Sequence, residues 1–160
     1  ALPRAWVPLS VVLVTFALNW LALTVIVLLF KLLGFSVHLS GILFSLPTWF
    51  ALGLTAIGLA WVVSTAQVLV RDVEGMLGPL FMLLSFVCGI QYGLDSIPAA
   101  WRDAVLANPF THAIARLHDT YLAGAGPALA DAWLLAGAAL VALLGYAFFR
   151  RVAPHVDDYL

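Results

Sequence analysis

The feature that most constrains the fold is a set of four long stretches without Asp, Glu, Lys or Arg, each at least 18 residues long. An α-helix rises 1.5 Å per residue, so about 20 apolar residues cross the roughly 30 Å hydrocarbon core of a bilayer. Backbone polar groups cannot stay unpaired in lipid, which makes these stretches helical. We therefore predict an all-α integral membrane protein whose four transmembrane helices cover about residues 8–31, 46–70, 75–94 and 129–149.

The composition supports this class and excludes others. The 160 residues are 64% hydrophobic and 9% charged, whereas soluble domains are about 45–50% apolar and about 25% charged. A net charge of −1 argues against nucleic-acid binding. Lys31 is the only lysine and lies outside any G-x-x-x-x-G-K-[ST] motif. We therefore expect a single transmembrane domain, residues 1–160, that is not itself an ATPase or another enzyme. Because the chain begins with Ala1, we also expect it to be part of a longer protein.

One segment, residues 95–127, interrupts the hydrophobic pattern between the third and fourth spans. Asn108 and Pro109 divide it into two short helices, an outer pair covering about residues 96–122. Ser96 or Asp95 is placed to cap the first helix, and Asn108 to cap a second helix that begins at Pro109. The distribution of Lys and Arg over the loops places this segment on the outer side of the membrane. Such helices either lie flat in the interface or re-enter the protein.

The second of these helices is amphipathic. Phe110, Ile114, Leu117 and Tyr121 recur at helical spacing and form its predicted apolar face. The opposite face carries His112, Arg116 and Asp119, which are the only residues that would support an interfacial enzyme. His112 and His118 lie six residues apart on different faces, and no further ligand completes a metal site. We therefore predict no catalytic residue and no metal.

The third predicted span carries a polar and aromatic stripe. Phe81, Ser85, Cys88 and Tyr92 recur at i, i+4, i+7 and i+11, which places them on one face of a helix. Polar groups within a span normally face the protein interior or a water-filled cavity. Two interpretations stay open: the stripe lines a translocation path, or it forms hydrogen bonds to neighbouring helices.

The second predicted span carries small residues on one face. Gly53, Ala56, Ala60 and Ser64 repeat at helical spacing, and small side chains allow a second helix to approach closely. We expect a helix–helix contact there.

A charge cluster separates the second and third spans. Arg71, Asp72 and Glu74 lie together between two apolar stretches. They are either a short solvated turn or a cytoplasmic gate or contact with a partner protein.

The sequence contains four short motifs: Cys88-Gly89-Ile90-Gln91-Tyr92, Ile97-Pro98, Trp101-Arg102 and Asn108-Pro109-Phe110-Thr111-His112-Ala113-Ile114. In this order and spacing they resemble the C-terminal part of the permease of ABC exporters for capsular polysaccharide and O-antigen. The similarity extends over roughly residues 55–151. Three positions depart from the family: Cys88 stands where Ser is usual, Ala115 where Glu is usual, and His118 where Arg is common.

The resemblance implies a homodimeric permease of the bacterial inner membrane. It would bind two ABC ATPase subunits, which hold ATP and Mg, and would export a lipid-linked or long polysaccharide. The outer helices would dip back into the membrane, with Asn108, Pro109 and His112 at their joint and with Trp101 and Phe110 joining the path candidates. The family has six spans, so two would precede this chain. The alternatives are an ABC permease for a drug or lipid, and a membrane scaffold or interfacial enzyme.

Overall fold

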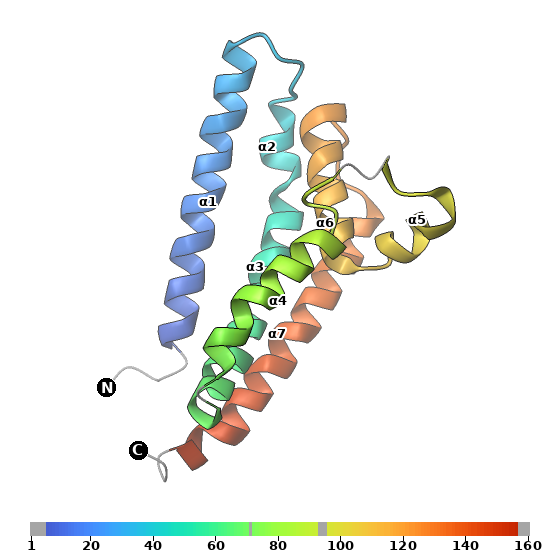
Figure 1. The fold of residues 1–160 in the computed structure, drawn as a ribbon. Helices are drawn as coiled ribbons and strands as arrows, with labels where there is room; N and C mark the ends of the chain where they lie inside the picture. Colours follow the sequence, from blue (N-terminus) through green and yellow to red (C-terminus); the bar gives the residue numbers. More distant parts are fainter. Residues whose placement is uncertain (1–5, 71, 93–95, 157–160) are drawn as a thin grey trace.

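The computed structural model describes residues 6–70, 72–92 and 96–156, and within these ranges it contains helices and no strand. The order of the helices along the chain can be followed in Figure 1. The elements are α1 (Trp6–Leu32), α2 (Ser40–Phe44), α3 (Leu46–Leu69), α4 (Val73–Val87), α5 (Ala99–Leu106), α6 (Pro109–His118), the π-helix η2 (Asp119–Ala123) and α7 (Leu129–Val156).

Three helical segments among the described residues are long and apolar enough to cross a membrane. They are Trp6–Leu32, the combined α2 and α3 segment Ser40–Val68, and Leu129–Val152 of α7. These segments overlap three of the four predicted spans, residues 8–31, 46–70 and 129–149. The class predicted from composition, an all-helical membrane protein, follows from the same segments.

The contact between α3 and α7 is the most extensive in the fold, and it depends on two glycines. A Cβ atom added to Gly58 would lie 2.6 Å from the carbonyl oxygen of Val141, and one added to Gly145 would overlap the Gly58 carbonyl. The two backbones therefore touch directly. Helices in lipid gain little from apolar burial against each other, so close van der Waals packing through small residues holds them together.

The predicted small-residue face of α3 is only partly the one that packs closely. Gly53 lies against the ring of Phe16 in α1, at an ordinary contact distance of 3.6 Å for an added Cβ. The closest helix approach instead uses Gly58, which lies outside the predicted face. The predicted face therefore includes the contact with α1 at Gly53, but not the closer contact with α7 at Gly58.

Glycines also end two of the long helices by the same hydrogen-bond pattern. After α1, the N–H of Gly34 (φ +87°) donates to Lys31 O and the N–H of Phe35 donates to Phe30 O. After α4, Gly89 (φ +71°) donates to Phe86 O and Ile90 donates to Ser85 O. This is the Schellman arrangement, in which a left-handed residue satisfies the last free carbonyls.

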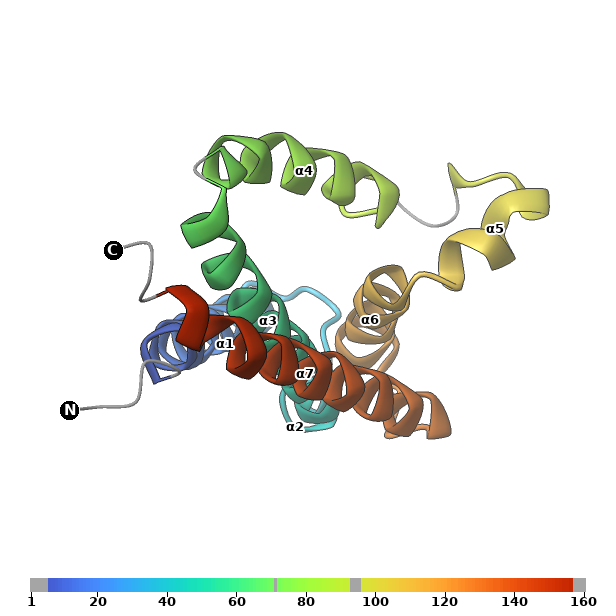
Figure 2. The same cartoon turned by 90° about the horizontal axis from the view of Figure 1, so that it is seen from below.

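The end of α4 corrects the prediction for residues 75–94. The helix has 15 residues, about 22 Å at 1.5 Å per residue, which is short of the roughly 30 Å hydrocarbon core. It stops at Val87 because Gly89 takes up the left-handed conformation, so the predicted extension to residue 94 is wrong. Figure 2 shows α4 at the edge of the molecule, apart from α7.

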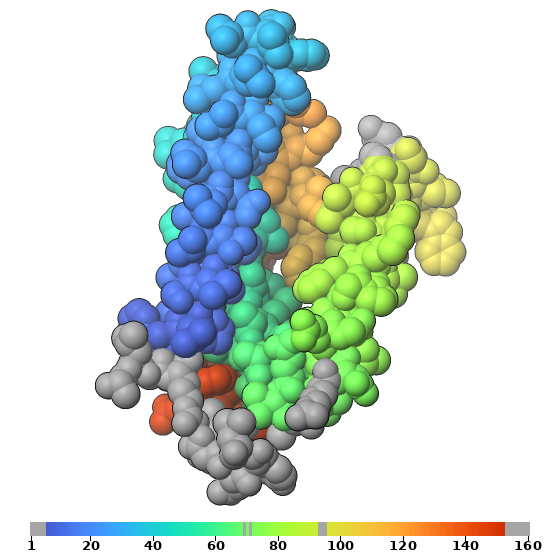
Figure 3. All heavy atoms as spheres, turned by 60° about the vertical axis from the view of Figure 1, so that its left-hand side comes forward, coloured from blue at the N-terminus to red at the C-terminus, as the bar shows by residue number. Residues whose placement is uncertain are grey.

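Much apolar surface on α1 and α4 stays exposed. Only 6% of the most apolar window of α1 is buried, and α4 has no buried residue. Figure 3 shows α1 and α4 standing apart, with α3 and α6 visible in the hollow between them. The well-packed frame is therefore α3 with α7, and the other long helices lie around it.

Replacing Gly58 with alanine should destabilise the chain, because the new methyl group meets the Val141 carbonyl. We expect a loss of about 1–3 kcal/mol in the free energy of unfolding, the usual cost of overpacking. Denaturation in mixed detergent and SDS micelles, followed by circular dichroism, measures it. Gly75→Ala is the matched control, since an added Cβ there meets nothing within 4 Å. Equal stability of the two variants would contradict the close helix contact.

Candidate functional site

A cavity of about 560 Å³ lies between α3, the joint of α5 and α6, and the first half of α7. Its wall is mostly apolar, with the aromatic rings of Phe110 and Trp133 and the imidazole of His112 among aliphatic side chains. Pockets of this kind, apolar with a few polar groups, are the usual binding sites of proteins. The remaining lining residues are Ala51, Leu52, Thr55, Leu59, Leu106, Ala107, Pro109, Ala113, Ala130, Leu134, Gly137, Ala138 and Val141.

His112 is the principal polar group available in this cavity. The other polar side chain of the wall, Thr55, already donates its hydroxyl proton to the Ala51 carbonyl at 2.9 Å. Among the described residues, the His112 side chain has no hydrogen bond or ion pair, whereas its backbone N–H donates to Asn108 O. Its ring nitrogens are therefore available to a bound molecule.

The position of α6 beside α3 places the α5–α6 joint next to the first half of α3. Pro109 and Phe110, at the start of α6, share the cavity wall with residues 51–59 of α3. At the other end, beyond α6, the Tyr121 hydroxyl lies 2.8 Å from Ser45 Oγ, just before α3 begins. Helix α6 therefore runs back along α3 toward the end where α3 starts, as Figure 1 also shows. Residues 51–59 lie about 8–20 Å from the start of α3 at 1.5 Å per residue, and the joint lies beside them.

Asn108 holds this joint together. Its side-chain oxygen accepts a hydrogen bond from Phe110 N at 3.0 Å, and Pro109 occupies the first position of α6. This confirms the predicted cap, since an Asn N-cap satisfies one free N–H and proline has none to satisfy. The Asn108 amide also donates to Cys88 Sγ at 3.5 Å. The joint is thereby attached to the segment that follows α4.

The start of α5 differs from the prediction. The helix begins at Ala99 with Pro98 in the N-cap position and without a side-chain cap, so Ser96 does not cap it. Asp95 lies outside the described residues. Proline fixes its own φ at about −65°, which suits it to the start of a helix.

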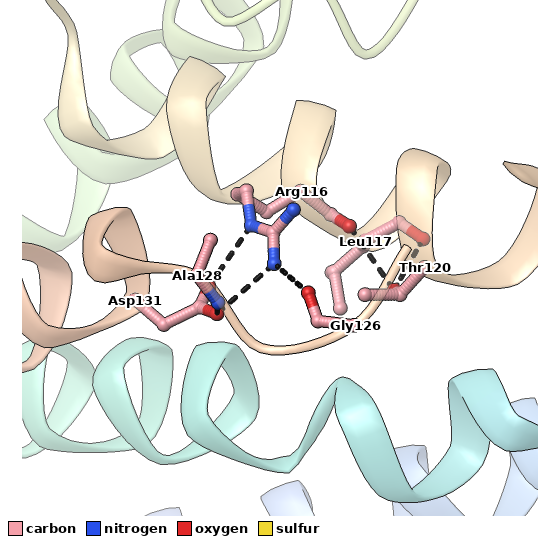
Figure 4. Close-up of polar contacts among 6 residues, drawn as sticks. All are labelled: Arg116, Leu117, Thr120, Gly126, Ala128 and Asp131. Carbon is pink, nitrogen blue, oxygen red and sulfur yellow. Dashed lines mark hydrogen bonds and ion pairs between the residues drawn. The ribbon is translucent and has the colours of Figure 1, made fainter. Parts of the chain in front are cut away.

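A buried ion pair fixes α6 to the start of α7 (Figure 4). Arg116 Nε donates to Asp131 Oδ1 at 2.9 Å, and its terminal nitrogen donates to Asp131 Oδ2 at 3.0 Å. The same terminal nitrogen donates to the Gly126 carbonyl at 3.0 Å. The two side chains are only 10% and 5% exposed. Such bidentate, charge-assisted pairs fix both the distance and the orientation of their partners.

Asp131 also stabilises the first turn of α7. Its Oδ2 accepts a hydrogen bond from Ala128 N at 2.7 Å. Ala128 precedes the first helical residue, so Asp131 acts as the acidic member of a capping box. The hydrogen bond with Asp131 raises the pKa of the Arg116 guanidinium above its ordinary value, against the opposing effect of burial. Arg116 therefore stays charged under all ordinary conditions.

The ion pair corrects the predicted polar face of α6. His112, Arg116 and Asp119 do not form a common solvated face, because Arg116 is buried against α7 while Asp119 is exposed. The prediction failed because helical spacing describes one helix only. It gives no information on the contact between Arg116 and Asp131, which lies 15 residues later in another helix. The available signal was Asp131 itself, an acidic residue at the very start of an apolar span.

A second set of contacts joins η2 to the α1–α3 connection. The backbone N–H of His38 donates to Tyr121 O at 2.9 Å. A Cβ added to Gly41 would lie 2.6 Å from Thr120 O, so α2 packs directly on η2. Together with the Ser45–Tyr121 contact, these interactions hold η2 against α2 and the start of α3.

The predicted stripe on the third span is not formed as one helix face. Phe81 is 59% exposed on α4, whereas Cys88 is 1% exposed and lies just beyond the helix end. Ser85 donates to the Met82 carbonyl, and Tyr92 follows the Gly89 turn. The prediction that these four share one face is wrong because α4 ends early. None of them lines the cavity of about 560 Å³, and neither does Trp101; Phe110, Pro109 and His112 do.

The charge cluster between α3 and α4 is exposed where the structure describes it. Asp72 and Glu74 lie on the surface at the start of α4, and Arg71 lies outside the described residues. Within the described ranges, no group of three His, Cys, Asp or Glu side chains is arranged to hold a metal ion.

The fold and the cavity define a helical membrane protein with an apolar, partly open site between α3, α7 and the α5–α6 joint. The family model of the ABC-2 type transporter matches residues 1–122. The chain therefore belongs to the ABC-2 type transporter family and is the membrane component of an ABC exporter, which works with a separate ABC ATPase. No curated protein and no solved structure gives a significant match.

Removing one member of the buried ion pair should be costly. In Arg116→Met the Asp131 carboxylate stays buried without its partner, which destabilises a fold by about 3–5 kcal/mol. The double variant Arg116→Met/Asp131→Leu should lose much less, since no unpaired charge remains. Unfolding free energies from SDS titration of the single and double variants measure the coupling. Additive losses in the double variant would show that the pair does not hold α6 to α7.

Loss of the Asn108 cap should weaken the joint by a smaller amount. Asn108→Ala leaves the Phe110 N–H unsatisfied, and such changes cost about 1 kcal/mol. Asn108→Asp keeps the acceptor oxygen and is the matched control. The same SDS titration distinguishes them, and equal losses in the two variants would contradict a capping role.

Proposed function

We propose that this chain is the permease subunit of an exporter that moves a polysaccharide of the capsule or O-antigen type across the bacterial inner membrane. Two copies of the chain pair, and two ABC ATPase subunits that bind ATP and Mg drive the cycle. The observation that carries the proposal is the re-entering α5–α6 pair, whose joint opens on the aromatic-lined cavity between α3 and α7.

The chemistry of the cavity suits a sugar chain. Phe110 and Trp133 offer flat apolar faces on which the C–H faces of sugar rings stack, and His112 offers hydrogen bonds to hydroxyl groups. A site that moves its substrate must bind weakly at several points, and the cavity has few polar groups to hold a sugar tightly. The motifs shared with polysaccharide exporters support the same substrate class.

The depth of the joint supports the re-entrant arrangement over an interfacial one. If α3 crosses the bilayer, the start of α6 lies beside the hydrocarbon-spanning part of α3. Irregular backbone at that depth is tolerated where protein surrounds it or where it lines a cavity, and residues 107–110 meet that condition. In this arrangement α4 serves as a fourth span together with neighbouring helices of the second copy.

The exposed acidic turn at Asp72 and Glu74 is our proposed contact with the ATPase. The turn lies at the end of the molecule opposite η2, where α4 begins (Figure 1). Arg71, which belongs to the same charge cluster in the sequence, is part of the proposed contact. A charged turn at the cytoplasmic ends of two helices is placed to transmit movement of a partner to both helices.

A second candidate function is export of a lipid or an apolar drug by the same architecture. The observation that favours it is the aliphatic majority of the cavity wall, including Leu52, Leu59 and Leu134. An apolar chain would fill this space without hydrogen bonds.

Deleting the gene distinguishes the two candidates. Loss of surface polysaccharide, with the precursor accumulating inside the cell, is expected if the chain exports a glycan. Unchanged surface polysaccharide together with altered lipid distribution between the leaflets would overturn the proposal in favour of the second candidate.

Phe110→Ala should lower polysaccharide export several-fold at equal membrane abundance, because it removes an aromatic face from the cavity. Surface glycan per cell, measured by antibody or lectin binding, gives the effect. The matched control is Phe50→Ala. Phe50 is 66% exposed and lines a different groove on the opposite side of α3, so its loss should leave export unchanged. Equal export by the two variants would show that Phe110 takes no part in the translocation path.

A further inference from the structure

Arg102 in α5 carries a charge that nothing in the described part of the chain neutralises. Its Nε atom is buried and has no hydrogen-bond partner. Arg116, the other arginine of the outer helix pair, donates instead to Asp131 and to Gly126. Arg116 is therefore paired within the fold, whereas Arg102 has no partner among the described residues.

An unpartnered buried donor of this kind is unfavourable. A buried N–H without an acceptor loses its hydrogen bonds to water, and the loss is larger when the donor carries a charge. Ionisable residues at membrane depth accordingly face cavities or pathways and bind a partner there. The exposure of Arg102 is intermediate, so a molecule from outside can reach the remaining guanidinium nitrogens.

The position of Arg102 connects it to the cavity. Arg102 lies four residues before Leu106, which places the two side chains on the same side of α5. Leu106 and Ala107 belong to the cavity wall. A molecule that occupies the cavity and extends along α5 therefore reaches Arg102 within one helical turn.

The nearby acidic residues do not satisfy Arg102. Asp103 is the next residue on α5 and points about 100° away around the helix. Asp131 is bound to Arg116, and Asp119 is exposed on η2. Among the described residues, Arg116–Asp131 is the ion pair of the outer segment, and Arg102 takes no part in one.

We propose that Arg102 binds an anionic group, a carboxylate or a phosphate, of the molecule that passes through the cavity. A guanidinium suits this role because its planar fork of donors matches the two oxygens of such groups. The inference rests on the proposed function for its substrate, and it narrows that substrate to an acidic glycan or one linked to a phosphate. A phospholipid headgroup offers the same chemistry, so the test separates the two sources.

The test measures binding of two probes to the complex with its ATPase, reconstituted in phosphatidylcholine vesicles. The probes are fluorescent oligogalacturonate, which is acidic, and uncharged dextran oligomers of equal length. We expect Arg102→Gln to weaken oligogalacturonate binding about tenfold, or about 1.4 kcal/mol, and to leave dextran binding unchanged. Lys31→Gln, which removes an exposed cation at the end of α1, is the matched control and should bind both probes as wild type.

A second variant and a second lipid complete the design. Arg102→Lys keeps the charge and loses the fork, so it should weaken oligogalacturonate binding by a smaller factor, about threefold. Adding phosphatidylglycerol to the vesicles tests the headgroup source: competition with oligogalacturonate in wild type, and its absence in Arg102→Gln, supports an anion site filled by lipid.

The outcomes separate the inference from the function. Equal oligogalacturonate binding by wild type, Arg102→Gln and Arg102→Lys, with no dependence on phosphatidylglycerol, would overturn the anion site and leave Arg102 as a side chain that extends to water. Failure of both sugar probes to bind wild type would count against the polysaccharide proposal. Direct binding of fluorescent phosphatidylglycerol, compared between wild type and Arg102→Gln, would then decide the anion site: weaker binding by Arg102→Gln would support it, and equal binding would overturn it.

Discussion

The buried ion pair between Arg116 and Asp131 is the interaction on which the outer half of this molecule depends. Two charges removed from water are stable only when they meet in good geometry and their remaining donors are satisfied. Here that requires α6, the Gly126 loop and the first turn of α7 to take up one arrangement. The pair therefore sets how far α6 can slide along α7, and with it the depth of the α5–α6 joint.

The cavity exists because this fixed helix pair stands beside a tightly packed frame. Gly58 and Gly145 bring α3 and α7 into backbone contact, and the joint then lies against both helices where they diverge. Helices α1 and α4 contribute little to this frame and keep large apolar faces exposed. Those faces are available to lipid or to helices of a partner protein. Transport by such a molecule would combine a rigid centre with more loosely attached outer helices.

Local sequence chemistry predicted the elements whose ends are marked by single residues. Asn108 and Pro109 specify a helix start by themselves, and uncharged runs specify α1, α3 and α7. The end of α4 could also have been predicted from Gly89, but the apolar run continues to Leu94 and suggested a longer helix.

Contacts between distant segments could not be predicted in this way. Two contacts depend on how the helices are placed relative to each other: that of Gly58 with Gly145 and that of Arg116 with Asp131. The spacing of residues within one helix does not predict such contacts. The cavity was only partly foreseen, since Phe110, Pro109 and His112 line it while the α4 stripe does not.

In a bilayer, the α5–α6 joint is expected to lie at the depth of the first half of α3, at the level of the cavity. The most direct measurement is the membrane depth of a nitroxide label at Ala107, which is exposed at the joint, in a Cys88→Ser background reconstituted in bilayers. Comparison of its collisions with oxygen and with a water-soluble nickel complex gives the depth. The account predicts a depth similar to that of a label at Leu59 of α3. A label at the level of the lipid headgroups, like one placed at Leu122 in η2, would contradict it.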